Sequence, residues 1–227
     1  GYIPGNVLES LLNCKLESLE LEIFNIPENE IVQMLDIQRQ NLMILSLHFH
    51  YDFRRRFEDC WRPEKLRSLK LSGISMITVN PSKNPILTTL ILVKVDLTNS
   101  SLMECLERAP NLEVVMISNI ASSFRLDLSV FEICKGLKHL ELEDLHCRKC
   151  ELKEFSNLET LKVDFFTNHI LKEIKAPKLK HLMLNKTGVE FCESCIPDNF
   201  SRIKRLTFTG YSNISILFFL KNLKYLE

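Results

Sequence analysis

Apolar residues recur along the chain in a short pattern in which positions one, four and six are apolar and the residues between them are mostly polar. Ten copies follow one another, and their first residues lie 20 to 26 positions apart. The copies begin at Leu16, Leu42, Leu66, Leu87, Leu112, Leu137, Leu158, Leu179, Ile203 and Leu223. A recurring period of this length indicates a repeat architecture with one structural unit per copy.

The two-residue spacing of positions four and six predicts a short strand in each copy. Side chains two apart on a strand point to the same face, so we expect Leu19 and Leu21 to be buried and Glu20 to be exposed. An apolar residue eight places after the first is also expected to be buried in most copies. These residues are Phe24, Ile74, Val95, Ile120, Leu145, Phe166 and Tyr211. One copy cannot bury this face alone, so stacked copies should form a continuous core beneath a parallel sheet in a curved solenoid.

The segments between the strands are predicted to differ from one another. Residues 27–40 and 100–110 have apolar residues at helical spacing, and we predict a helix in each. The first has a proline near its start, and the second has a serine cap and a proline stop. Residues 73–85 contain β-branched residues and two prolines, which favour an extended or irregular return.

Residues 48–65 gather five aromatic side chains around three consecutive arginines. One interpretation is an exposed interface, because aromatic residues and arginine are enriched there. The other is an amphipathic helix on the convex side that buries Phe53, Phe57 and Trp61. The four-residue spacing of these three favours the helix.

The whole chain resembles a leucine-rich-repeat domain, and the phrases APNLEVV (Ala109 to Val115) and APKLKHLML (Ala176 to Leu184) are similar to the repeats of F-box leucine-rich-repeat proteins. In that family the repeats bind a substrate, and an upstream F-box binds a Skp-type adaptor of a cullin ubiquitin ligase. The resemblance implies an α/β leucine-rich-repeat solenoid with a parallel sheet on its concave face and mixed helices and irregular returns on its convex face. We expect residues 1–227 to form a single domain of about ten repeats and to be a fragment of a longer chain.

The expected concave surface is polar at both ends of the array and apolar in the middle. Position five of each copy is exposed, and it is apolar at Ile91 and Met116. An apolar cluster on an otherwise polar face is typical of a protein-binding patch. The predicted partner-binding residues are Ile91, Val93, Val114, Met116, Met43 and Ile44. The alternative is that convex residues, a longer loop or a neighbouring chain cover these side chains.

The chain has 29 basic and 29 acidic residues, so no overall charge favours nucleic acid or an anionic membrane. Its most apolar run, Ile214 to Leu220, is far shorter than the roughly 18 to 20 residues of a membrane span. We therefore expect neither nucleic acid nor a membrane as a partner. The charged residues at the two ends of the array either orient a partner or are a solvated face. They are Glu17, Glu20 and Glu22 on the first copy and Lys180, His181, Lys204 and Arg205 on later copies.

Eight cysteines include two Cys-x-x-Cys pairs, Cys147 with Cys150 and Cys192 with Cys195. The pairs follow strands two copies apart, about 10 Å, and zinc binds sulfur at about 2.3 Å. We therefore expect no shared metal site. The absence of a compact disulfide framework favours an intracellular protein of the cytoplasm or nucleus. Four Asn-x-Ser/Thr sequons, among them Asn99, argue weakly for secretion.

The chain contains no nucleophile motif, phosphate loop or paired acid signature, so we expect neither catalysis nor a cofactor. We predict a protein–protein recognition module that binds its partner on the concave face. The resemblance narrows this to the substrate-recognition part of an F-box type ubiquitin ligase receptor, with a Skp-type adaptor bound through an upstream region. The alternative is an extracellular or structural leucine-rich-repeat recognition protein.

Overall fold

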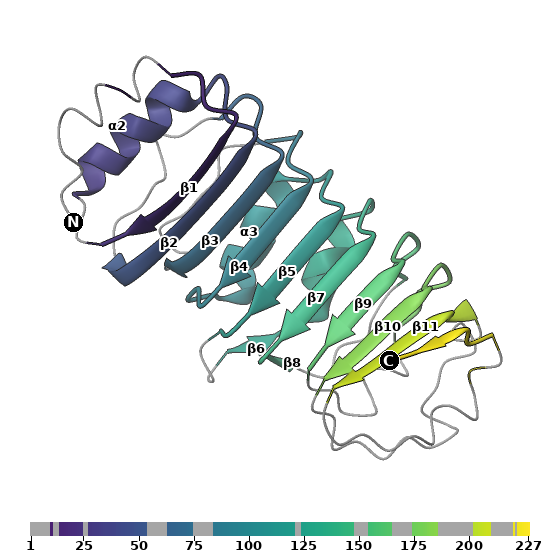
Figure 1. Cartoon of the computed structure of the whole chain (residues 1–227). Coiled ribbons are helices and arrows are strands. Elements are labelled where there is room, and N and C mark those ends of the chain that lie inside the picture. Colours follow the sequence, from purple (N-terminus) through teal and green to yellow (C-terminus); the bar gives the residue numbers. More distant parts are fainter. Residues whose placement is uncertain are drawn as a thin grey trace.

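The strands of all ten copies join one parallel sheet in a computed structural model (Figure 1). The structure describes residues 10, 14–24, 27–53, 63–74, 84–120, 124–147, 154–164, 174–185, 202–209, 220 and 222–227. The strands, in order across the sheet, are β1 (Ser18–Ile23), β2 (Ile44–Phe53), β3 (Ser68–Ile74), β4 (Thr89–Val93), β5 (Val114–Ser118), β7 (His139–Glu143), β9 (Thr160–Val163), β10 (His181–Asn185), β11 (Arg205–Thr209) and β12 (Tyr225–Leu226). The expected parallel sheet is confirmed.

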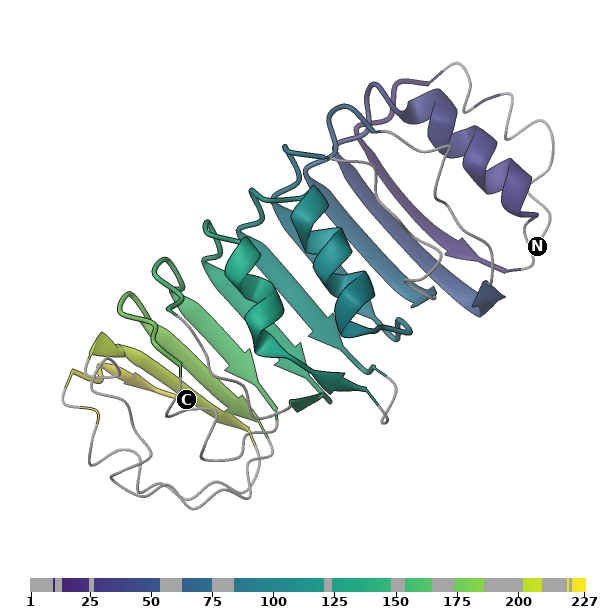
Figure 2. The same ribbon diagram turned by 180° about the vertical axis from the view of Figure 1, so that it is seen from behind.

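The described part of the chain includes three helices beside the sheet. They are α2 (Glu28–Gln38), α3 (Asn99–Arg108) and the 3-10 helix η2 (Leu128–Ile133), and α3 and η2 lie across one face of the sheet in Figure 2. Below η2 a second, two-stranded sheet joins β6 (Arg125–Leu126) and β8 (His146–Cys147). We call the face of the main sheet opposite α3 and η2 the open face.

Both helices predicted from periodicity are confirmed, but the cap of α3 differs from the prediction. The N-cap is Thr98, whose Oγ1 accepts a hydrogen bond from the Ser101 backbone N–H at 3.0 Å. The Ser101 hydroxyl oxygen accepts in return from the Thr98 N–H, also at 3.0 Å. This reciprocal pair satisfies two backbone donors that a helix start leaves without intrahelical partners.

The hydrophobic core lies between the sheet and the helices. In the third copy, for example, Leu66, Leu69 and Leu71 are each no more than 2% exposed. The end copies bury less. Leu21, which was expected to be buried, is only partly covered, and Leu226 is 54% exposed. Each end strand has a neighbouring strand on one side only.

Within the described ranges, four copies turn at the seventh residue after their first leucine, where φ is positive. These residues are Gly73 (φ 72°), Lys94 (φ 52°), Asn119 (φ 56°) and Asp144 (φ 51°). The left-handed residue interrupts the strand alternation, so the residue after it points inward. The burial predicted eight places after the first leucine is therefore confirmed at Ile74, Val95, Ile120 and Leu145.

The first two copies lack this turn, and the burial predicted for Phe24 is wrong. Their strands continue to alternate, so that Ile23 and Phe49 are the buried residues. Phe24 is 45% exposed and stacks on His50, with ring centroids 3.9 Å apart. The same prediction for Phe166 and Tyr211 falls outside the described residues.

Several other expectations fall partly or wholly outside the described residues. Phe53 is the last residue of β2, an extended segment, whereas Phe57 and Trp61 are not described. Gly73 and Ile74 end β3, and residues 75–83 of the predicted irregular return are not described. The side chains of both Cys-x-x-Cys pairs also lie outside the described set.

Candidate protein-binding face

Residues at equivalent positions of the copies form rows across the open face, because neighbouring strands pair without a shift at these positions. The residues at position five of the copies lie side by side in one row, as the sequence predicted. Its residues are Glu20, Ser46, Lys70, Ile91, Met116, Glu141, Lys162, Met183 and Thr207. Parallel strands lie about 4.8 Å apart, so side chains next to each other in a row are in reach of one another.

The central patch consists of Ile91, Val93, Val114 and Met116, on the adjacent strands β4 and β5. Ile91 lies directly opposite Met116 in the strand register. All four side chains are partly exposed, whereas the residues between them, such as Leu92 and Val115, are fully buried. The structure therefore brings four of the six predicted binding residues together on one surface.

The other two predicted residues, Met43 and Ile44, lie apart from the central patch. Ile44 is 48% exposed on the open face of β2 and pairs with Ser68 of β3. Strand β3 separates it from β4, so about 10 Å of polar surface lies between them. Met43 precedes β2 and lies at the edge of the sheet, where its carbonyl oxygen accepts a hydrogen bond from the Arg67 N–H at 2.8 Å.

A compact charged cluster borders the central patch on strands β7 and β9. Glu141 lies directly opposite Met116 in the register. Lys162 Nζ lies 2.7 Å from Glu141 Oε1 and 2.5 Å from Glu143 Oε1. His139 Nε2 lies 3.4 Å from the other oxygen of Glu141. One lysine thus links two carboxylates from the neighbouring strand.

Burial and pairing act in opposite directions on the ionisation of this cluster. Burial of Glu141 opposes its charge, but the hydrogen bonds from His139 and Lys162 outweigh burial and lower the pKa of the carboxyl group. Burial likewise disfavours the charged form of Lys162, but its hydrogen bonds to Glu141 and Glu143 raise the pKa of the ammonium group. Both effects keep the pair ionised at neutral pH.

The two histidines of this face do not share a site. His139 and His181 occupy one row but are separated by Thr160 of β9. His181 Nε2 lies 3.1 Å from Thr207 Oγ1, and burial followed by the nearby Arg205 charge lowers the pKa of His181. Among the residues described by the structure, no group of three or more His, Cys, Asp or Glu side chains is arranged to hold a metal ion.

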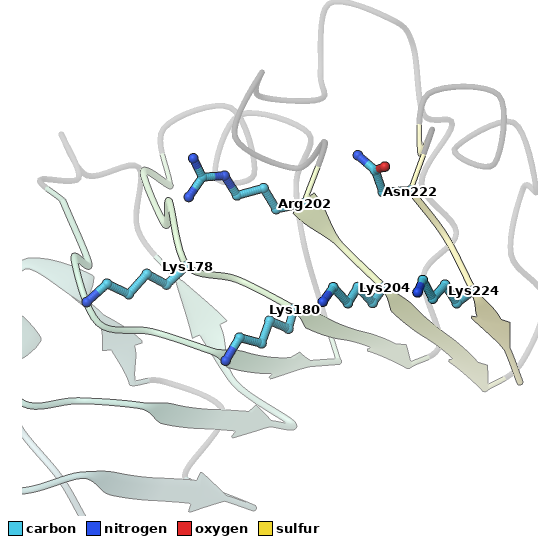
Figure 3. A pocket seen from close by; sticks show the side chains of 6 residues that line it. All are labelled: Lys178, Lys180, Arg202, Lys204, Asn222 and Lys224. Carbon is cyan, nitrogen blue, oxygen red and sulfur yellow. The ribbon is translucent and has the colours of Figure 1, made fainter.

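A basic groove lies at the edge of the last copies, where β10 to β12 begin (Figure 3). It has a volume of about 350 Å³ and is lined by Lys178, Lys180, Arg202, Lys204, Asn222 and Lys224. Lys180 and Lys204 were predicted only as charged residues at one end of the array. The groove could have been found from the sequence, because its lining residues directly precede and follow the first apolar residue of the last three copies.

The charged residues predicted at the two ends of the open face are partly paired with residues of opposite charge or with aromatic rings. Arg205 lies over the Tyr225 ring at 5.2 Å from its centroid, and its Nε lies 3.8 Å from Glu227 Oε1. At the other end, Glu22 lies 4.0 Å from His50 Nε2. The dense positive charge of the later copies therefore lies in the edge groove and not on the open face.

Comparison with known proteins identifies the fold. No protein-family model matches the chain, and no curated protein matches it. Among solved structures, a chain of the mouse RP105/MD-1 complex matches 90% of this chain with a TM-score of 0.56 and 17% sequence identity. This chain spans 40% of the length of that one. With the open, ten-stranded parallel sheet, the match establishes an α/β leucine-rich-repeat solenoid.

Proposed function

We propose that the protein is a recognition module that binds a protein partner on the open face of its sheet, over the central patch. The observation that carries this proposal is the alignment of Ile91 with Met116, flanked by Val93 and Val114, on a largely polar face. Removing apolar surface from water on binding contributes roughly 25 cal/mol of favourable free energy per Å². An apolar centre with a polar border is the usual arrangement of a protein–protein interface.

The charged cluster beside the patch suits the border of such an interface. The ammonium group of Lys162 already binds two carboxylates, so a partner that covers it leaves no lysine charge unpaired. The charges of the cluster would then determine how the partner is aligned on the open face and would contribute less to the total affinity. In this proposal the protein acts by binding and not by catalysis.

We propose that the protein is intracellular, and two observations about single residues support this. Cys105 in α3 and Cys134 directly after η2 are buried free thiols, as is common in a reducing compartment. The sequon residue Asn99 uses both ends of its side-chain amide. Its Nδ2 donates to the Arg125 carbonyl at 2.9 Å, and its Oδ1 accepts from the Asp127 N–H at 2.8 Å. A glycan on Asn99 would replace one of the two Nδ2 hydrogens next to the Arg125 carbonyl.

A narrower form of the proposal is a substrate receptor of an F-box type ubiquitin ligase. It rests on the similarity of the repeat phrases at Ala109 to Val115 and Ala176 to Leu184. The test is co-purification of a Skp-type adaptor with the full-length gene product. Its absence would remove the ligase role and leave the recognition role standing. Glycans on the sequons, or cysteines resistant to alkylation without reductant, would instead favour the extracellular alternative.

The recognition role is tested with a partner identified by affinity purification of the full-length product. We expect the double substitution Ile91→Lys with Met116→Lys to weaken binding of that purified partner by about tenfold or more, because it places two charges in the apolar centre. The matched control is Ile44→Lys with Met183→Lys, which makes the same changes on the open face outside the patch. Unchanged affinity in a folded patch variant would overturn the proposal.

A further inference from the structure

The second residue of each copy forms a continuous row along the edge where the strands begin. From the second copy on, the backbone N–H of each of these residues donates to the carbonyl of its counterpart in the preceding copy, at 2.8 to 2.9 Å throughout. We call this the edge row. Its members are Glu17, Met43, Arg67, Thr88, Glu113, Lys138, Glu159, Lys180, Lys204 and Lys224.

In the middle of the edge row, acidic and basic residues alternate and pair between adjacent copies. Lys138 Nζ lies 2.9 Å from Glu113 Oε1. Lys180 Nζ lies 2.8 Å from Glu159 Oε2. The hydrogen bond from Lys180 also lowers the pKa of the Glu159 carboxyl group. A carboxylate in this row is therefore well placed to bind the lysine of the neighbouring copy.

The alternation ends after Lys180. The next two members are Lys204 and Lys224, and neither forms an ion pair with any residue in the described part of the chain. Like charges on directly adjacent strands are destabilising. The edge row thus has positive charge at three successive copies with no carboxylate after Glu159 to balance it.

The basic groove adds a second row of donors beside these lysines (Figure 3). Lys178 Nζ donates to Asn157 Oδ1 at 2.7 Å, and an Arg202 guanidinium N–H donates to the Pro177 carbonyl at 3.1 Å. These bonds hold the two side chains along one wall. Of the six lining residues that the structure describes, five are cationic and none is acidic, although the chain as a whole has a formal net charge of zero.

We propose that the basic groove binds an extended acidic segment of a protein partner, whose carboxylates lie between Lys180, Lys204 and Lys224 as Glu159 lies beside Lys180. This deepens the proposed function and rests on it, because it gives the partner a second, electrostatic contact away from the central patch. The pairs at Glu113 and Glu159 provide the geometric precedent for such a carboxylate. The volume of about 350 Å³ suits a short segment and not a folded domain.

The composition of the groove favours an acidic peptide over a nucleic acid. Single-stranded nucleic acid is bound through aromatic side chains on which bases stack, and none of the lining residues that the structure describes is aromatic. Four of the lining residues are lysines, whose compact charges pair with single carboxylates without a planar, two-pronged geometry. Binding of this kind weakens as the salt concentration rises.

The test uses a fluorescein-labelled hexaglutamate peptide, with fluorescence anisotropy as the readout at low and physiological salt. We expect wild type to bind hexaglutamate but not hexaglutamine. Lys204→Glu should reduce hexaglutamate affinity by about tenfold or more. The melting temperature of this variant should stay the same or rise, because the substitution restores the alternation between Lys180 and Lys224. Loss of binding therefore cannot be attributed to unfolding.

The matched control is Arg67→Glu, an exposed position of the same row with the same change of charge. We expect it to alter hexaglutamate affinity by less than about twofold, because it lies outside the groove. Equal losses in the two variants would overturn the proposal, as would failure of wild type to bind hexaglutamate at low salt. A labelled oligothymidylate that binds more tightly than hexaglutamate, and is equally weakened by Lys204→Glu, would also overturn it in favour of nucleic acid.

Failure of this inference can be told apart from failure of the proposed function. The double substitution of Ile91 and Met116 on the open face should leave hexaglutamate binding unchanged, whereas Lys204→Glu leaves the central patch intact. A partner that loses affinity only in the patch variant supports the recognition role and refutes a role for the groove.

Discussion

Gly73 of β3 lies against the backbone of Phe49 in the neighbouring strand β2. A Cβ atom on Gly73 would overlap the Phe49 carbonyl oxygen, and the φ angle of Gly73 is 72°. The Phe49 carbonyl leaves no space for a side chain, and the positive φ further disfavours one because it brings Cβ against the residue's own backbone. Lys94, Asn119 and Asp144 have a positive φ at the equivalent position of later copies.

We predict that Gly73→Ala lowers the free energy of unfolding by about 2 kcal/mol or more, since backbone strain and steric overlap add together. The measurement is urea unfolding followed by circular dichroism. Gly136→Ala is the control, because a Cβ there would meet the Leu112 carbonyl at an ordinary contact distance of 3.6 Å. A loss at Gly73 no larger than that at Gly136 would show that the turn relaxes.

The pairing of Glu141 with Lys162 and His139 predicts a pH dependence of stability. Because the pKa of Glu141 is below its ordinary value of 4.5 in the folded chain, its contribution is complete above that value and is lost as pH falls through the lowered pKa. We expect Glu141→Gln to lose roughly 1 kcal/mol of stability at neutral pH, after allowing for solvent screening. The stability of the variant should also fall less steeply than that of wild type between about pH 6 and pH 3.

The control for this prediction is Glu20→Gln, in the same row of the open face but exposed on β1. An exposed glutamate of this kind contributes less than roughly 0.5 kcal/mol at neutral pH. Chemical unfolding at several pH values measures both variants. Identical pH profiles for wild type and Glu141→Gln would contradict the role assigned to the cluster.

Thiol chemistry provides a third prediction. Burial raises the pKa of Cys105 and of Cys134 to about 12, so neither forms a thiolate at neutral pH. Native protein treated with iodoacetamide should be modified at the exposed Cys14 and react at Cys105 and Cys134 only on unfolding. Peptide mapping by mass spectrometry, with and without urea, measures this. Fast native modification of Cys105 would mean that the space between α3 and η2 opens readily.

The repeat pattern was sufficient to predict the strands and most of the buried positions. One strand forms in each copy, because apolar residues two apart must face the core wherever a copy stacks on its neighbour. The prediction was wrong at Phe24, because the first two copies have no left-handed residue at the turn and their strands run on. The prediction did not consider the residue type seven places after the first residue of each copy. Gly73, Asn119 and Asp144 tolerate a positive φ at this place, whereas Ile23 and Phe49 do not.

The binding residues could be predicted only in part. Ile91 and Met116 occupy equivalent positions of consecutive copies, so their proximity follows from the repeat alone. Ile44 was grouped with them by residue type, but strand order places β3 and its exposed Lys70 between them. The basic groove was not predicted, because its positive charge is evident only when the residues of three successive copies are taken together.

Sequence periodicity thus determines the backbone architecture of this protein, since each copy can bury its apolar positions only against the next. Tertiary structure decides which polar groups become partners. Lys162 binds two carboxylates of the strand before it, while Lys204 at the edge has no carboxylate partner among the described residues, although both belong to equivalent copies. The physical reason is that burial depends on whether a position is apolar, whereas charge pairing depends on which side chains the register brings within about 3 Å.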